Sequence, residues 1–319
     1  MKATGNRQQA TGNRSALVSF CFCLLLYHPS PAQETARIAV VDFTGDGQSE
    51  AVLFRQMVAR EFALVDEELV RAALRGSGYT GSLNLSREEA RAPGMSIGCD
   101  YYLLGIVRVA RRIVSAEEFY YDGLAGIFTV ETRSGRLLLF DLTRTKAADE
   151  KTARAQLDEL LKQSWKKSSG AITQAVSRSH TESAISNRPP VEVIEVLGDE
   201  TRQKNIAQPV FYQRLKPRYT EEAESLSIVA TVELEAVFRE DGQVGDVEVM
   251  RWAGFGLEES AIATLRQLRF KPAERDGKAV SLRALVRYNF RRPPLAAEVK
   301  EEAERLRRSL RDAPRPPKP

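Results

Sequence analysis

The chain is poor in the residue types that most enzyme and metal sites require. Among its 319 residues there are two histidines, His28 and His180, and three cysteines. A metal site built on several histidines is therefore excluded, and a Ser/His/Asp or Cys/His catalytic site would have to use His180. Because His180 lies in a Ser-rich stretch typical of a solvated linker, we expect this histidine to be exposed to solvent.

The cysteines offer little further chemistry. Cys21 and Cys23 follow Phe20 and Phe22, where a lipoprotein signal needs a small residue, so lipidation is not expected. Both cysteines lie in an N-terminal segment that we expect to be removed, and Cys99 then has no partner for an intramolecular disulfide bond. Cys99 precedes an apolar run, which predicts a small buried side chain rather than a reactive thiol.

Carboxylates are plentiful, but none occurs in the pattern of an active or metal site. The stretch from Asp42 to Gly47 partly resembles the start of a calcium-binding loop, yet the twelfth position is Leu53 instead of a bidentate glutamate. No pair of acidic residues accompanies a nucleophile, a metal-ligand pattern or a glycine-rich phosphate loop. The sequence therefore predicts no enzyme, no metal and no cofactor.

The net charge of +4 is unevenly distributed along the chain. The first 32 residues contain three basic side chains and no acid, and the tail after Phe290 holds nine basic against five acidic residues. The chain between these ends is slightly acidic. A basic surface for nucleic acid is not expected, and no nucleic-acid partner is predicted.

The N-terminus has the organisation of an export signal. A basic region precedes twelve uncharged residues, Ala16–Tyr27, and Ser30 and Ala32 provide the small residues of a cleavage site. The apolar run is too short for a transmembrane helix, which needs about 20 residues. We therefore predict a signal peptide over residues 1–32. A short uncleaved anchor is the alternative.

Residues 33–176 alternate between strand and helix patterns. Asp66 has the position of a helix N-cap, and Ser86 with Glu89 has the spacing of a capping box. The helix after Ser86 is expected to end before Pro93. The order of elements predicts one α/β domain, with strands expected at 37–43, 100–109, 126–130 and 136–142 and a long final helix at 147–176.

The chain after this domain changes character. Residues 177–208 contain a Ser-, Thr- and Asn-rich stretch that ends in Pro189-Pro190, which predicts a linker. Residues 292–319 form a basic, Pro-rich tail. Between them, residues 209–291 are expected to fold as a second domain.

The expected second domain carries strand alternation of period two. From Ser227 to Arg239 every second residue is apolar, an Asp-Gly turn follows, and the chain returns as a partner strand. An apolar stripe then predicts a helix with Glu258 and Glu259 at the positive end of its dipole. A last alternating strand, 280–290, completes a small antiparallel sheet backed by one helix. The fold class is thus mixed, α/β followed by α+β.

The first domain resembles, weakly, the N-terminal domain of the TolB and curli-secretion lipoprotein group. The resemblance rests on three short strings and one hairpin: Ile38–Phe43, Leu64–Asp66, Ile97–Gly105 and Thr132–Arg136. These strings are mostly core-forming, so the resemblance implies a fold and says little about chemistry.

Residues 209–291 resemble the C-terminal domain of TonB-type energy transducers. The matching elements occur in the family's order: Lys216–Tyr219 followed by Ala223, Glu240–Val244, Gly254–Leu257, Ala261–Ala263, Leu268–Ala273 and Asp276–Lys278. Two features depart from the family. Thr220 stands where the family usually has proline, and the N-terminal apolar run is only about half a membrane span, with Ser19 and His28 not on one helix face.

The resemblance implies a peptide-binding protein of the periplasm, or one anchored in the inner membrane and facing the periplasm. An edge strand can accept an extended peptide as an added strand, and in this family the peptide is the N-terminal box of an outer-membrane receptor. Arg283 and Arg287 would face an acidic peptide, or would simply keep the edge soluble. The implied binding residues are Arg283, Ala284, Leu285, Val286, Arg287, Tyr288 and Asn289.

The resemblance also limits the set of partners. An outer-membrane TonB-dependent receptor or another envelope protein is the expected partner, and homodimer formation is left open. The departures at the N-terminus put coupling to inner-membrane motor proteins in doubt. The alternative function is a component of envelope assembly or secretion, in which the TonB-like domain serves only for docking.

Overall fold

The computed structural model describes residues 35–114, 118–182, 194–195 and 206–291, and within these ranges it mixes helices and strands as predicted. The signal-peptide prediction, the tail and most of the expected linker lie outside the described residues. The described residues, which begin at Thr35, belong to one compact unit.

The first sheet is built from six strands that precede residue 150. Its strand order is β3-β1-β5-β6-β7, and β2 pairs with β5. The short strands pair in parallel and the three long strands in antiparallel fashion. The strands are β1 (Arg37–Val40), β2 (Thr44–Gly45), β3 (Ala63–Leu64), β5 (Tyr101–Ile113), β6 (Phe119–Glu131) and β7 (Leu137–Ala147).

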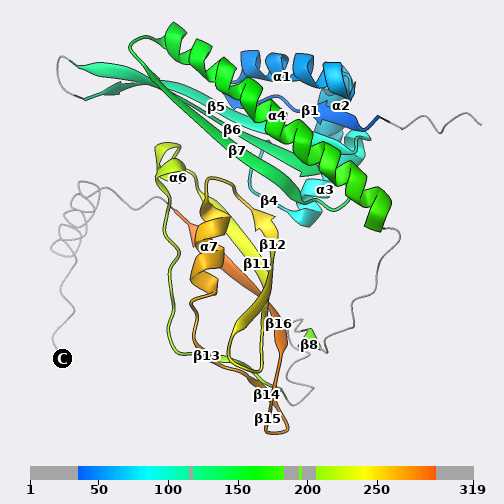
Figure 1. Cartoon of the computed structure of the whole chain (residues 1–319), viewed down its shortest axis with the longest axis vertical. Coiled ribbons are helices and arrows are strands. Elements are labelled where there is room, and N and C mark those ends of the chain that lie inside the picture. The colour runs from blue at the N-terminus through cyan, green and yellow to red at the C-terminus, as the bar shows by residue number, and fades with distance from the viewer. Residues whose placement is uncertain (1–34, 115–117, 183–193, 196–205, 292–319) are drawn as a thin grey trace, which may run out of the picture. The chain divides into compact units, whose positions relative to one another are not determined.

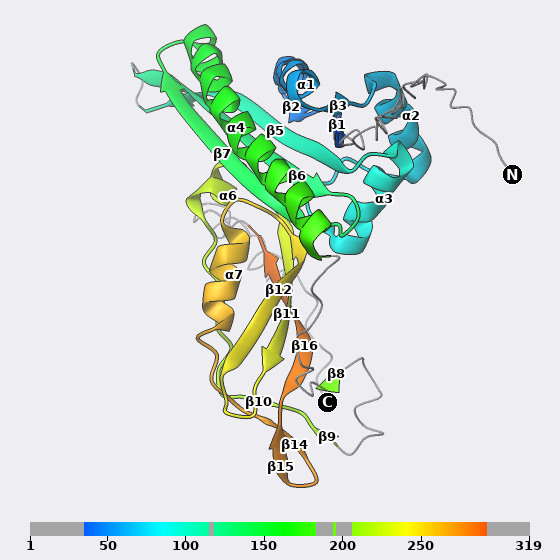
Figure 2. The ribbon, with the colours of Figure 1, turned by 45° about the vertical axis from the view of Figure 1, so that its right-hand side comes forward.

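Helices cover one face of this sheet. Figures 1 and 2 both show α1 (Gln48–Glu61) and α4 (Glu150–Glu182) on the same side of β5 and β6. Phe54 of α1 and Trp165 of α4 meet edge to face, 6.2 Å between ring centroids, above the buried strand residue Leu103. Burial of these aromatic side chains fixes both helices on the sheet.

The two shorter helices begin as the sequence predicts, but one of them runs further. The Asp66 side chain caps α2 (Glu67–Ser77), and the capping box of Ser86 and Glu89 opens α3 (Arg87–Ile97). The prediction that α3 ends before Pro93 is wrong. A proline fits helical φ and removes only one backbone donor, and the helix ends instead at Gly98, which is left-handed.

The second sheet contains the predicted hairpin and last strand. Its order is β4-β12-β11-β16-β8, and β11 pairs in antiparallel fashion with both β12 and β16. The elements are β4 (Leu85–Ser86), β8 (Ile194–Glu195), α6 (Glu221–Ser225), β11 (Ala230–Phe238), β12 (Val244–Trp252), α7 (Leu257–Leu265) and β16 (Leu282–Phe290). Two small sheets are separate from it: β10 (Val210–Phe211) pairs with β13 (Phe270–Lys271), and β14 (Ala273–Arg275) pairs with β15 (Lys278–Val280) and β9 (Ile206–Ala207).

One strand of the second sheet comes from the first part of the chain. β4 pairs with β12, so that Leu85 lies opposite Trp252 and Ser86 opposite Arg251. The Asn84 side chain, next to β4, donates to the carbonyls of Thr231 and Trp252 and accepts the Thr231 N–H. These side chain–backbone hydrogen bonds therefore join residues that are 147 or more positions apart in the sequence.

The apolar cores of the two sheets are continuous across this junction. Phe128 of β6 lies within 5.4 Å of Trp252 and 6.0 Å of Phe255, measured between ring centroids. Phe140 of β7 approaches Phe255 to 4.9 Å. The predicted division at 177–208 remains a prediction, and α4, β8 and β9 occupy part of that range.

Candidate peptide-binding edge

β16 is held along its whole length by β11. Their register runs from Ala230 opposite Phe290 to Phe238 opposite Leu282. Both ends of β16, Leu282 and Phe290, are buried, which anchors the strand at its two ends. Alternate residues between them, namely Ala284, Val286 and Tyr288, pack against the apolar core. The strand is therefore a rigid edge.

The opposite face of β16 carries ion pairs. Arg283 donates to the Glu235 carboxylate at 2.8 Å, and Arg287 pairs with Glu233 at 2.6 Å. Leu285 lies between them with 53% of its surface exposed. The structure thus places all seven predicted binding residues on one strand, but it gives the two arginines carboxylate partners on β11. Both arginines are therefore already paired with carboxylates of the chain itself and are less available to an acidic peptide.

The open side of β16 begins after its second residue. β8 pairs in parallel with Leu282 and Arg283. From Ala284 to Phe290, no other strand of the described part of the chain pairs on the side opposite β11. An unpaired strand edge presents backbone N–H and C=O groups that can hydrogen-bond an extended peptide.

The family motif around Gly254 forms the corner between β12 and α7. Gly254, Phe255 and Gly256 all have positive φ, at 75°, 57° and 72°. A Cβ on Gly254 would lie 2.8 Å from the Phe128 ring, so only glycine fits there. The left-handed run turns Phe255 into the core, where it is 1% exposed. Phe255 bears strain that its burial offsets.

The motif at Tyr219 ties the start of this region together. The Tyr219 hydroxyl lies 3.0 Å from the Ala223 carbonyl and 2.8 Å from the Ile228 carbonyl. Thr220, which replaces the family's usual proline, caps α6 through the Ala223 N–H and donates to the Phe255 carbonyl at 2.6 Å. The departure from the family pattern thus supplies a cap and a tie to the Gly254–Gly256 corner.

Glu258 has a role that the sequence does not reveal. It was expected to complement the helix dipole, and it does lie in the first turn of α7, but its side chain is buried. One carboxylate oxygen accepts the N–H groups of Ala253 and Gly254, the latter at 2.7 Å. Burial raises the pKa of Glu258 to about 7, although these hydrogen bonds act in the opposite direction.

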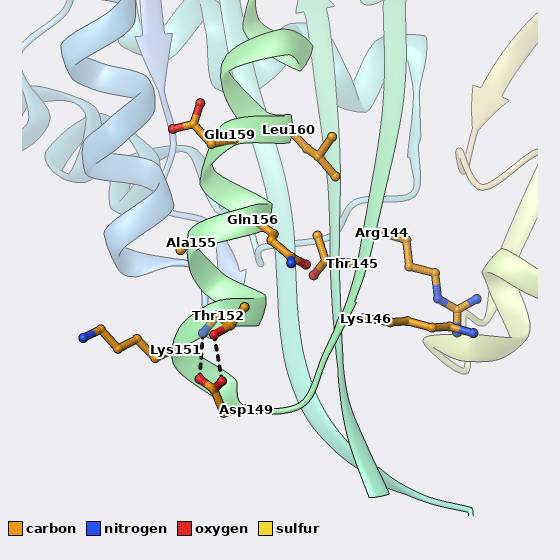
Figure 3. A pocket seen from close by; sticks show the side chains of 10 residues that line it. All are labelled: Arg144, Thr145, Lys146, Asp149, Lys151, Thr152, Ala155, Gln156, Glu159 and Leu160. Carbon is orange, nitrogen blue, oxygen red and sulfur yellow. Dashed lines mark hydrogen bonds between the residues drawn. The ribbon is translucent and has the colours of Figure 1, made fainter.

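A hollow on the described surface lies elsewhere, between β7 and α4. It has a volume of about 940 Å³ and is shown in Figure 3. Asp149 accepts hydrogen bonds from the N–H and hydroxyl of Thr152 and so caps the helix. Arg144 points away from the helix and holds Asp122 at 2.8 Å. The contact between the Thr152 hydroxyl and the Asp149 carboxylate is thus accounted for by the helix cap.

Two observations concern the metal-binding and thiol groups of the part of the chain that the structure describes. That part holds no group of three or more His, Cys, Asp or Glu side chains placed to bind a metal ion. Cys99 is 6% exposed, and burial raises its thiol pKa to about 11, as expected for a structural cysteine. His180 falls within α4 instead of the expected linker.

Comparison with known proteins confirms the resemblance of the C-terminal region. Residues 216–291 match the family of the Gram-negative bacterial TonB protein C-terminal. This segment is therefore similar to the C-terminal domain of TonB proteins. A search of curated proteins found no relative of the chain.

Three solved structures are among those that the chain is similar to. Lipoprotein GNA1162 from Neisseria meningitidis is 12% identical with a TM-score of 0.30, over 40% of this chain and 96% of that protein. The Pseudomonas aeruginosa TonB C-terminal domain is 19% identical with a TM-score of 0.25, over 33% and 98%. The LpoB C-terminal domain from Salmonella enterica is 14% identical with a TM-score of 0.26, over 36% and 86%.

No helix in the described part of the chain is both long enough and apolar enough to span a membrane. The prediction for residues 1–32 lies outside the described residues.

Proposed function

We propose that the protein is a non-enzymatic, periplasmic TonB-like protein that binds an extended segment of an outer-membrane receptor by adding it to β16. The observation that carries the proposal is the edge from Ala284 to Phe290, which has no strand partner opposite β11 among the described residues. The family match over 216–291 supplies the partner class. Energy-dependent transport across the outer membrane is the process such binding would serve.

The geometry favours recognition through the backbone. Because Arg283 and Arg287 already contact Glu235 and Glu233, a bound peptide gains little from meeting these charges. Strand addition instead draws its affinity from main-chain hydrogen bonds and its specificity from alternate side chains. The exposed Leu285 side chain offers the incoming strand an apolar contact on the outer face.

The test is a titration of the chain that begins at Thr35, where the compact unit starts. A shorter fragment would open the core that Phe128 and Phe255 share. Peptides from the N-termini of TonB-dependent receptors should shift the backbone amide resonances of residues 284–290. A scrambled peptide of the same composition is the control. Unchanged resonances along β16 at saturating peptide would refute the proposal.

A further inference from the structure

β16 already carries a strand of its own chain at one end. Ile194 lies opposite Leu282 and Glu195 opposite Arg283, and the two strands run in parallel. Figures 1 and 2 both show β8 beside the start of β16. β8 lies on the side of β16 that faces away from β11, which is the side where an added strand would pair.

We propose that β8 belongs to a tethered strand that competes with the incoming peptide for the edge of β16. The inference rests on the proposed function, because a competitor matters only if the edge binds a peptide. It adds a form of regulation: the protein partly occupies its own binding edge, and a partner must displace β8 to pair along all of β16.

The register between the strands agrees with the types of residue that it pairs at the buried end of β16. It sets an apolar residue, Ile194, opposite the buried apolar Leu282. The sequence around β8, Pro190-Val-Glu-Val-Ile-Glu-Val-Leu197, is rich in β-branched residues and has no glycine or internal proline. Such a composition favours extended backbone.

The position of β8 in the chain makes the competition effective yet reversible. β8 is connected to α4 and to β9, both of which are fixed in the fold, so it never leaves the vicinity of β16. A strand on short connections has an effective concentration of the order of millimolar. Its described pairing covers only Leu282 and Arg283, so a longer peptide can displace it.

The experiment compares three forms of the chain from Thr35. In the double variant Ile194→Pro/Glu195→Pro, prolines remove the backbone donors of β8 and prevent strand pairing. The control variant Ile194→Val/Glu195→Gln keeps the donors and the β-branched residue. The probe is a fluorescein-labelled synthetic peptide with the sequence of residues 190–197, and thermal unfolding confirms that all three proteins remain folded.

The proposal predicts how the three proteins differ in their affinity for the probe. The proline variant should bind the probe about threefold more tightly than the parent chain, because the edge is no longer partly occupied. The control variant should bind as the parent does. In the absence of probe, the amide resonances of Leu282 and Arg283 should shift in the proline variant and stay in place in the control.

Other outcomes separate the two proposals. Equal affinity of the parent chain and the proline variant overturns the competition, and so does failure of the probe to bind the proline variant. In either case a receptor peptide that shifts residues 284–290 leaves the proposed function intact. If receptor peptides bind neither protein, the proposed function fails and the inference fails with it.

Discussion

Glu258 should make the stability of the fold depend on pH near neutrality. Burial raises the pKa of this carboxyl from 4.5 to about 7, so the folded state prefers the protonated form. Below about pH 4.5 the group is neutral in both the folded and the unfolded chain. Between these two values the folded chain binds more protons than the unfolded chain, and the free energy of unfolding falls as pH rises.

The size of the effect follows from the shift in pKa. A rise from 4.5 to about 7 corresponds to roughly 3 kcal/mol, because one pKa unit is worth about 1.4 kcal/mol. The decrease in the free energy of unfolding is complete once the pH exceeds the pKa of Glu258 in the folded chain. Glu258→Gln removes the titration and keeps the oxygen that accepts the Ala253 and Gly254 N–H groups. The variant should match the parent chain near pH 4.5 and be about 3 kcal/mol more stable at pH 8.

Urea unfolding followed by tryptophan fluorescence measures this difference. Trp252 lies in the core beside the Gly254 corner and reports on its opening. Subtracting the free energies of unfolding of the two proteins leaves the pH dependence that is due to Glu258, because all other groups titrate in both proteins. The neighbouring Glu259 is the control, because Glu259→Gln leaves the buried carboxyl in place. The reasoning would be refuted if the difference in the free energy of unfolding between Glu258→Gln and the parent chain stayed constant from pH 5 to pH 8, or if it grew toward low pH.

Three further predictions concern other parts of the chain. Asn84→Ala removes hydrogen bonds to Thr231 and Trp252 and should lower the free energy of unfolding by about 2–4 kcal/mol in urea, whereas Ser82→Ala should change it by less than about 1 kcal/mol. A loss of less than about 1 kcal/mol for Asn84→Ala would contradict this role. Cys99 should react with a thiol reagent only after denaturant is added, since it is buried and its pKa is raised to about 11; rapid labelling of the native protein would contradict this. N-terminal sequencing of the exported protein should begin at Gln33, and retention of Met1 would favour the anchored alternative.

Periodicity predicted the second sheet well because its strands have one buried and one exposed face. In β11, Val232 and Leu234 are fully buried, whereas Thr231 and Glu235 on the other face are only partly buried. Glu233, which lies between Val232 and Leu234, departs from the period-two pattern because it is buried in ion pairs with Arg251 and Arg287. The same reasoning placed the β11–β12 hairpin and the last strand. Where local sequence and tertiary environment agree, the pattern alone locates an element.

The features that the sequence did not reveal depend on distant contacts. β4 has only two residues, which is too short for any periodicity, and its pairing with Trp252 joins residues far apart in the chain. Glu258 has the sequence position of an ordinary dipole residue, and its burial arises from the corner formed by Ala253 and Gly254. The pairing of β8 with Leu282 lies in a stretch whose composition indicated a linker.

These distant contacts explain how a small sheet can offer a firm binding edge. A strand that accepts a peptide must keep its own backbone straight without a partner on one side. β16 achieves this because β11 pairs with every one of its residues, and β11 in turn is held by Asn84 and by the core around Phe128. The part of the chain before residue 150 therefore stabilises the edge from behind, and the ion pairs of Arg283 and Arg287 hold its outer face. The backbone from Ala284 onward has no strand partner opposite β11 in the described chain. Under the proposed function, a partner would therefore be selected by how well it extends along β16 rather than by its charge.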